Sequence, residues 1–354
     1  MTSMPHPGPI RDEVVLGVDT HKHSHAAVVL TGAGVYLGGQ QFPATRAGYA
    51  QLIEWAAGLG RLRRAGVEGT GSYGAGLTRA LTAAGIEVAD INRPDRAARR
   101  RRGKTDLVDA EAAARTVLAG KATVIPKTGN GAVETIRILK IAKDSAVKAQ
   151  VQAINQLKAI LITTEPALRE LLEPLSKAKL LHRCTQLDPA GHHPVTAAAI
   201  HTLRLLARRA QYLGQEIRSL QQQLTHTITQ TAPQLLHLAG IGPDTAATLL
   251  ITAGDNPHRL HSEASFAALC GVSPIEASSG KTRRHRLNRG GHRQANAALY
   301  LATLTNLRWN PQTRAYKTRR TAQGLSTREI IRCLKRYLAR SAYRIIRDAI
   351  PTPA

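Results

Sequence analysis

The sequence is poor in cysteine and has no long hydrophobic run. Its three cysteines, Cys184, Cys270 and Cys333, are far apart, which excludes a disulfide framework and zinc-site spacings and favours a reduced compartment. No apolar run reaches the roughly 18 residues of a membrane span, and residues 1–11 lack the core of a signal peptide. We therefore expect a cytoplasmic protein without a membrane partner.

Aromatic and acidic residues are also scarce. Aromatic side chains make up 3% of the chain, so base stacking is not expected to dominate nucleic-acid binding. The 24 aspartates and glutamates are outnumbered by 49 lysines and arginines, which gives a formal charge of +25. This excess indicates nucleic acid as the partner before a membrane surface. A chain of 354 residues is long enough for two or three domains.

Four carboxylates in the first third of the chain lie in contexts that would expose them. Asp19 ends the apolar run 14–18, Glu68 precedes a glycine-rich turn, and Asp106 and Asp109 lie three residues apart. On a helix, that spacing places both aspartates on one face. Gathered carboxylates repel one another unless a cation is present, and hard cations such as Mg2+ or Mn2+ serve in phosphoryl transfer. The pattern therefore indicates a divalent-metal site.

Each acid also has a simpler interpretation. Asp19 could form a turn after a strand, and Asp106 with Asp109 could be an ordinary acidic first turn of a helix. A basic run before Asp106 favours the metal site, because it suits a site that grips a polyanion. The run includes Arg99, Arg100, Arg101, Arg102 and Lys104. For the alternating histidines of residues 21–25, we expect contacts with solvent or phosphate rather than metal ligation.

Hydrophobic patterning predicts an α/β unit followed by a helical middle. Strands are predicted over 14–18, 26–30, 34–41, 65–67 and 86–91, and helices over 49–59, 76–84 and 105–118. After a Gly-Asn-Gly boundary at 129–131, apolar residues recur at helical spacing through 147–161 and as a heptad seam through 203–224. This favours a protruding coiled-coil hairpin or a dimer interface, with a helix pair packed on its own domain as the alternative. The expected domains are a tail (1–12), the α/β domain (13–128), the coiled coil (129–230), a serine-bearing domain (231–310) and a basic helical tail (311–354).

Two loops in the last third suit contact with phosphates. Gly240 and Gly242 flank an isoleucine, which is typical of a helix-hairpin-helix turn, although a glycine cap followed by proline looks similar. Ser278 and Ser279 precede a glycine among basic residues, so one of them could attack a phosphate, although Ser-Ser-Gly is also a common loop sequence. The basic residues expected to bind nucleic acid here are Lys281, Arg283, Arg284, Arg286, Arg289 and Arg293. Because the segment 281–347 contains a single acid, it needs an anionic partner.

Taken in order, the acidic quartet, the helical middle, the Gly-Ile-Gly-Pro turn and the Ser-Ser-Gly sequence resemble one family. This is the IS-one-ten (IS110) family of DEDD transposases, the bridge-RNA-guided insertion-sequence recombinases, and the resemblance covers about residues 14–307. It implies a RuvC-like (RNase H-like) N-terminal domain, a coiled-coil linker and a mainly α C-terminal transposase domain. The matching residues are Asp19, Glu68, Asp106 and Asp109 for Mg2+ binding, and Ser279, or its neighbour Ser278, for the attacking serine.

The resemblance also implies partners. These are a structured noncoding RNA that pairs with donor and target DNA, and a homodimer that assembles into a tetramer. We therefore expect a nucleoid-associated transposase that excises and inserts DNA by Mg2+-assisted serine attack. Two alternatives stay open: a RuvC-like nuclease or junction resolvase that needs no serine, and a noncatalytic nucleic-acid-binding scaffold.

Overall fold

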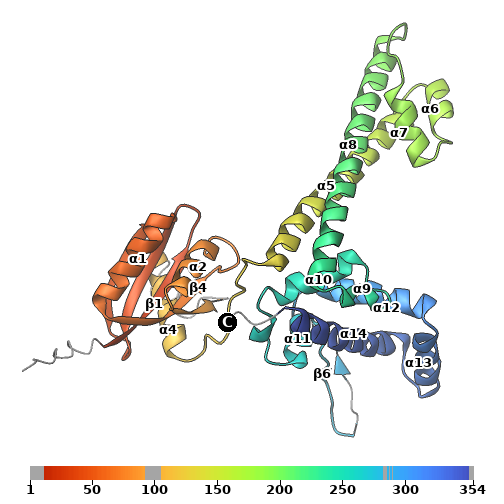
Figure 1. Ribbon diagram of the computed structural model, residues 1–354. Coiled ribbons are helices and arrows are strands. Elements are labelled where there is room, and N and C mark those ends of the chain that lie inside the picture. Colours follow the sequence, from red (N-terminus) through yellow and green to blue (C-terminus); the bar gives the residue numbers. More distant parts are fainter. Residues whose placement is uncertain (1–11, 92–104, 282–284, 287, 289, 351–354) are drawn as a thin grey trace, which may run out of the picture. The chain divides into compact units, whose positions relative to one another are not determined.

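The computed structural model describes residues 12–91, 105–281, 285–286, 288 and 290–350. The chain divides into two units, Met1–Gly129 and Asn130–Ala354, called here the first and second unit (Figure 1). The first combines a sheet with helices, and the second is helical apart from one short hairpin. None of the helices in the described ranges combines the length and hydrophobicity that a membrane span requires.

Five strands form a mixed sheet in the first unit. They are β1 (Glu13–Thr20), β2 (Ser24–Thr31), β3 (Tyr36–Pro43), β4 (Arg61–Glu68) and β5 (Glu87–Ile91), in the spatial order β3-β2-β1-β4-β5. Strand β2 pairs antiparallel with β1 and β3, whereas β4 pairs parallel with β1 and β5. Both β1 and β2 lie inside the sheet and are buried on both faces, which explains their continuous apolar sequences.

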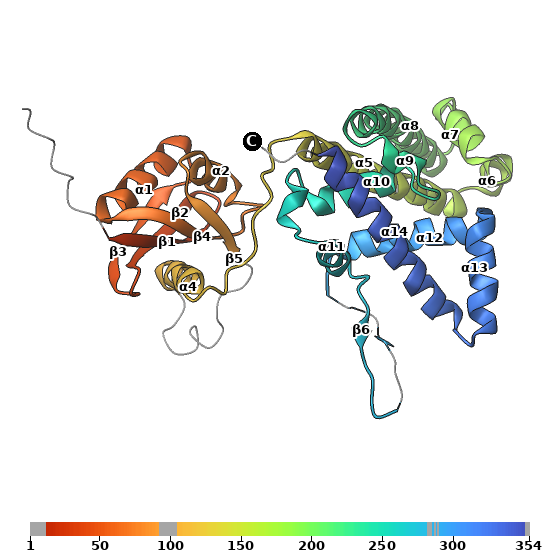
Figure 2. The same cartoon turned by 60° about the horizontal axis from the view of Figure 1, so that its bottom comes forward.

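Helices cover both faces of this sheet (Figure 2). Helices α1 (Arg46–Leu59) and α2 (Ala75–Ala83) share a core with one face of β1, which includes Leu16. Helix α4 (Asp106–Leu118) packs on the opposite face against Val15. The predicted α/β organisation is confirmed, and it is consistent with a RuvC-like fold.

Helix α4 lies unusually close to the sheet because two strand positions are glycine. A Cβ atom at Gly17 of β1 would lie 2.0 Å from the carbonyl oxygen of Ala110 and 2.4 Å from the nitrogen of Ala114. A Cβ atom at Gly66 of β4 would lie 2.9 Å from the carbonyl oxygen of Ala113. The backbone of α4 therefore rests directly on β1 and β4, a position that no larger strand residue permits.

Two long helices, α5 (Ala132–Thr163) and α8 (Pro194–Thr231), lie side by side in the second unit (Figure 1). They run antiparallel, because the start of α5 shares a core with the end of α8 and the end of α5 shares another with the start of α8. The short helices α6 (Pro166–Leu172) and α7 (Lys177–Thr185) connect them and complete the second of these cores.

The predicted seam is only partly buried between these helices. Leu203 and Leu224 of α8 are buried, as the heptad pattern predicts. On α5, however, Val147 and Val151 are 38% and 51% exposed, so helical spacing alone does not reveal which apolar residues face the partner helix. The coiled-coil geometry itself stays a prediction.

Most of the remaining elements pack around the base of the helix pair, whereas the hairpin of β6 (Ile275–Glu276) and β7 (His285–Arg286) projects from it (Figure 2). The other elements are α9 (Gln234–His237), α10 (Pro243–Ala253), the 3-10 helix η1 (Pro257–Arg259), α11 (Glu263–Leu269), α12 (Arg293–Trp309), α13 (Pro311–Ala322) and α14 (Thr327–Ala349). Their core includes Ala339, Tyr343 and Ile346 of α14, and the hydroxyl group of Tyr343 donates to the carbonyl of Leu260. The basic last helix is therefore an integral part of this unit rather than an appended tail.

Candidate active site

Two of the four acids are placed by neighbouring parallel strands. Asp19 is the last residue but one of β1, and Glu68 is the last residue of β4. The register pairs Val18 with Val67, so both acids emerge at the same carboxyl edge of the sheet. The hydroxyl group of Thr20 donates to the Glu68 carbonyl oxygen at 2.8 Å, which ties the two strand ends together.

The other two acids come from the first turns of α4. Thr105 caps this helix, and its hydroxyl oxygen accepts a hydrogen bond from the backbone nitrogen of Val108 at 3.3 Å. Asp106 opens the helix, and Asp109 is buried, with 4% of its surface exposed. Because Gly17 lets α4 rest on β1 next to Asp19, the helix start is held at the strand end that carries the first acid.

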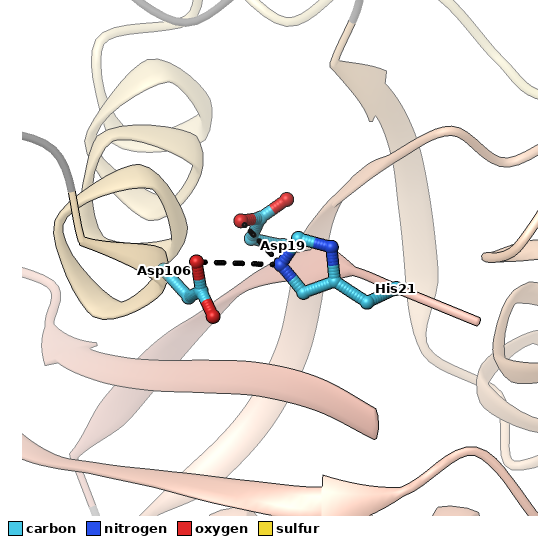
Figure 3. A group of neighbouring side chains, drawn as sticks. All are labelled: Asp19, His21 and Asp106. Carbon is cyan, nitrogen blue, oxygen red and sulfur yellow. Dashed lines mark ion pairs between the residues drawn. The ribbon is translucent and has the colours of Figure 1, made fainter. Parts of the chain in front are cut away.

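His21 joins this group, as Figure 3 shows. Its Nε2 atom lies 3.4 Å from Asp19 Oδ2 and 3.4 Å from Asp106 Oδ1. Ligand atoms of the three residues all lie within 4.8 Å of one another. From the sequence alone, we expect this histidine to contact solvent or phosphate. Its position two residues after Asp19, at the strand end, was the available signal for a place in the site.

The neighbouring histidine, His25, has a different environment. It is fully buried in β2 and stacks on Tyr49, with ring centroids 5.6 Å apart. Burial lowers the pKa of its imidazole below the ordinary 6.5, the backbone of Ser24 partly offsets this, and the nearby His21 lowers it further. The histidines of residues 21–25 therefore do not act as one cluster.

All four acids line one hollow of about 320 Å³. Thr20, His21, Gly69, Ser72 and Tyr73 line it as well, and none of its described lining residues is a lysine or arginine. Carboxylate oxygens are the ligands that hard divalent cations prefer, and an imidazole nitrogen can complete such a set. The donor set therefore fits a divalent cation, which Asp19, His21 and Asp106 are close enough together to share.

The candidate nucleophiles belong to the second unit. Ser278 and Ser279 are exposed and lie between β6 and β7, just before Gly280, whose φ is 56°. The base of this loop is closed at two glycines, because a Cβ atom at Gly291 would lie 2.6 Å from the nitrogen of Gly271. The loop thus leaves and rejoins the helical core at one point.

The predicted nucleic-acid-binding residues fall into three groups. Lys281, Arg286 and Arg293 are exposed around the serine loop. Gly240 packs inward, since a Cβ atom there would lie 2.5 Å from the carbonyl oxygen of Ala302, whereas Gly242 has open space beside it. The rest lie outside the described residues: Arg99, Arg100, Arg101, Arg102, Lys104, Arg283, Arg284 and Arg289.

Comparison with known proteins matches two transposase families. A family of transposases of the DEDD type found in IS110 matches residues 16–166, which contain all four acids. The family described as transposase IS116/IS110/IS902 matches residues 232–318, which contain both candidate serines.

Two curated relatives are similar over shorter stretches. The insertion element IS110 43.6 kDa protein of Streptomyces coelicolor is 30% identical over 118 residues, which are 33% of this chain and 29% of that protein. The transposase for insertion sequence element IS1328 of Yersinia enterocolitica is 27% identical over 183 residues, which are 50% of this chain and 51% of that protein. The chain thus spans about half the length of these relatives or less.

Proposed function

We propose that this chain, which belongs to the IS110 family of DEDD transposases, is a DNA recombinase that excises and inserts a mobile element. The observation that carries the proposal is the convergence of Asp19, Glu68, Asp106 and Asp109 on one hollow. Two strand ends and one helix start supply these acids, so the framework of the sheet presets their positions.

In the proposed reaction, the four acids would bind the metal and the serine would attack the phosphate. Asp19, Glu68, Asp106 and Asp109 would hold Mg2+ or Mn2+, whose chemistry there is to neutralise and polarise phosphate oxygens. The Ser279 hydroxyl oxygen forms a bond to phosphorus while the bond from phosphorus to one deoxyribose oxygen breaks. The serine proton is lost, and the departing oxygen gains one. The phosphoserine ester conserves the energy of the phosphodiester, so strands can be rejoined without ATP.

The partners of the reaction follow from the family and from the charge. With 49 basic against 24 acidic residues, the chain is suited to hold donor and target DNA together with a structured noncoding bridge RNA. We also infer a homodimer that assembles into a tetramer. Val147 and Val151 are exposed one helical turn apart on α5, so they share a face of the helix, and a contact between copies there would bury both.

A denaturing-gel assay tests this function. Purified protein is incubated with labelled donor and target DNA, the flanking noncoding RNA and Mg2+. We expect wild type to give a protein-linked DNA band and joined products, both dependent on RNA and Mg2+. Asp19→Asn and Ser279→Ala should abolish both products. Ser278→Ala tests the neighbouring hydroxyl, and Glu54→Gln and Ser219→Ala, which change exposed residues away from the site, should be active.

The alternative enzyme gives a different pattern. A metal-dependent nuclease that activates water would cleave DNA without a protein-linked band, and both serine variants would keep that activity. Because the acids line a hollow within the first unit alone, such cleavage requires no residue of the serine loop. Cleavage that survives in both Ser278→Ala and Ser279→Ala but is lost in Asp19→Asn would contradict the serine mechanism. It would support the nuclease.

A further inference from the structure

The second unit contains a pocket of about 500 Å³ that the chemistry above does not use. One wall is formed by residues 271–274 together with His285, Arg286 and Asn288, which belong to the two stretches through which the serine loop leaves and rejoins the core. The other wall is formed by α14 and by Arg320 and Leu325 before it. Its volume lies in the range of small-molecule sites, about 300–1,000 Å³. It therefore suits a single nucleotide and is too small for a duplex.

The pocket is strongly cationic. Five basic side chains line it, namely Arg286, Arg320, Arg332, Lys335 and Arg336. Glu329 is the one acid among its described lining residues, and it is engaged by the capping box of α14, where it accepts hydrogen bonds from the Ser326 nitrogen and hydroxyl group at 2.9 and 2.7 Å. Glu329 also pairs with Arg332 at 3.8 Å, and Arg336 pairs with Glu263 at 3.1 Å. The other three basic side chains have no carboxylate partner among the described residues, which favours a phosphate-bearing ligand.

Two guanidinium nitrogens in this lining lack an acceptor. Arg320 donates from Nη1 to Gln323 at 2.6 Å, but its buried Nε has no hydrogen-bond partner among the described residues. Arg336 donates from Nη2 to Glu263 at 3.1 Å, but its buried Nη1 likewise has none. An unsatisfied buried donor costs about 1–3 kcal/mol. A phosphate oxygen in the pocket would supply an acceptor after a small shift of either side chain.

Part of the lining is apolar, and hydrogen bonds connect the elements that carry it. Val272, Pro274, Leu325 and Tyr337 contribute apolar surface, and Tyr337 is held edge-on by Tyr316 with ring centroids 5.9 Å apart. At the back, buried Lys335 donates to Asn296 at 2.9 Å, and Asn296 donates to the carbonyl oxygen of Gly271 at 2.7 Å. This chain of bonds joins α14, α12 and the start of the serine loop. The lining thus combines cationic and apolar side chains, and both walls contribute to each kind.

We propose that this pocket binds one unpaired nucleotide of the DNA strand, with its phosphate at the arginines and its base against the apolar side chains of the lining. The inference rests on the proposed function, because that function brings DNA to the serine loop. The two ends of this loop form a wall of the pocket, so the DNA strand is the one that reaches it. Docking a nucleotide there would fix the strand relative to Ser278 and Ser279 before any bond is broken.

The reactivity of Cys333 can show whether this pocket is occupied. Cys333 lines it and is partly exposed, whereas Cys184 and Cys270 are buried, and burial raises their thiol pKa to about 11 and about 12. The full-length protein is treated with iodoacetamide and analysed by peptide mass spectrometry. The modification rate of Cys333 can then be compared with the slower rates expected for Cys184 and Cys270. At about ten times its Kd, a deoxynucleoside 5′-monophosphate should slow modification of Cys333 about tenfold, because only about one pocket in eleven remains empty.

Variants and ligand analogues make the test specific. Arg332→Gln should weaken nucleotide binding about tenfold or more in a calorimetric titration, the loss expected for one charge-assisted hydrogen bond. Arg344→Gln, an exposed change on the same helix outside the pocket, should bind as wild type does. Inorganic phosphate and the nucleoside without phosphate should each protect Cys333 less than the nucleotide does. Asp19→Asn, which changes the other unit, should bind normally even if it abolishes recombination.

Four results would overturn the inference. The first is unchanged Cys333 modification at high nucleotide concentration together with no calorimetric binding. The second is equal protection by phosphate alone, which would leave only an anion site, and the third is wild-type affinity in Arg332→Gln. The fourth is tighter binding of the ribonucleotide than of the deoxynucleotide, which would assign the pocket to RNA. Nucleotide binding is measured here without any strand exchange. A protein that recombines DNA but does not bind the nucleotide would therefore contradict this inference and leave the proposed function intact.

Discussion

The Nε2 atom of His21 lies 3.4 Å from Oδ1 of Asp106, and the same nitrogen lies 3.4 Å from Oδ2 of Asp19. One imidazole nitrogen thus connects an acid at the end of a strand with an acid at the start of a helix. Ligands that surround one divalent ion at about 2.0–2.6 Å lie at most about 5 Å apart, and these atoms satisfy that limit. His21 is therefore placed either to ligate the ion or to orient the carboxylates that do.

Removing this imidazole should weaken metal binding. For His21→Ala we expect the Mn2+ affinity, measured by calorimetric titration, to fall about 10- to 100-fold, the usual effect of losing a group that supports metal ligands. His23→Ala removes an exposed histidine from the same turn and serves as the matched control. Equal Mn2+ affinities in wild type and His21→Ala would exclude His21 from the metal site.

Helix α4 packs so closely on the sheet that we expect one added methyl group at Gly17 to destabilise the fold. Gly17→Ala would place a Cβ atom 2.0 Å from the carbonyl oxygen of Ala110, so α4 must move away. We expect the free energy of unfolding in urea to fall by about 1–3 kcal/mol, as for other overpacked cores. Mn2+ affinity should fall as well, because Asp106 and Asp109 move with the helix.

The control for Gly17→Ala is Gly58→Ala. Gly58 lies in α1, and a Cβ atom there meets nothing within 4 Å. Because alanine favours a helix over glycine, this variant should be neutral or stabilised by up to about 1 kcal/mol. If both variants unfolded at the same urea concentration, α4 would not be held tightly against β1.

The buried imidazole of His25 should make the fold sensitive to acid. Its pKa in the folded state lies below the ordinary 6.5, so the unfolded chain binds this proton first as the pH falls. The neutral imidazole therefore makes its full contribution to the free energy of unfolding above pH 6.5. As the pH falls below 6.5, the free energy of unfolding decreases by at most about 1.4 kcal/mol per pH unit. Urea unfolding of wild type and His25→Phe at about pH 7.5 and about pH 5.5 measures this. The phenylalanine, which can still stack on Tyr49, should show a smaller loss.

At the closed base of the serine loop, alanine in place of Gly291 should destabilise the protein through both backbone strain and a steric clash. Gly291 and Gly324 have similar φ values of 87° and 85°, so alanine is strained at both, by about 1–2 kcal/mol. Only at Gly291 does a Cβ atom also meet backbone, at 2.6 Å from the nitrogen of Gly271, whereas Gly324 has open space. Gly291→Ala should therefore cost about 1–3 kcal/mol more than Gly324→Ala in urea unfolding. Equal costs would show that the loop base is not tightly closed.

Much of the first unit follows from its sequence, because its apolar runs have clear periods and lengths. The runs 14–18 and 26–30 became β1 and β2, and the acids predicted at strand ends lie there. What the sequence could not supply was contact between elements. Gly17 looked like an ordinary residue of an apolar run, and its importance depends on which helix lies above it.

The second unit was harder to predict because long helices offer several apolar stripes. Val147 and Val151 have the spacing of a seam but are exposed, and only the partner helix decides which stripe is buried. High charge made α14 look like a tail, yet Ala339, Tyr343 and Ile346 form a stripe that belongs to the core. The place of His21 beside Asp106 could not be predicted for a related reason, since the two residues are distant in the sequence.

If the chain binds nucleic acid as proposed, the position of α14 would link that binding to the integrity of the protein. This helix carries one stripe in the core and arginines elsewhere, including the exposed Arg328 and Arg344, so its folding brings like charges together. A polyanion that binds the folded helix relieves this repulsion and stabilises the second unit by mass action. Copies engaged with nucleic acid would then persist, while idle copies would open more often and be degraded sooner. The abundance of the protein would in this way follow the supply of its own substrate.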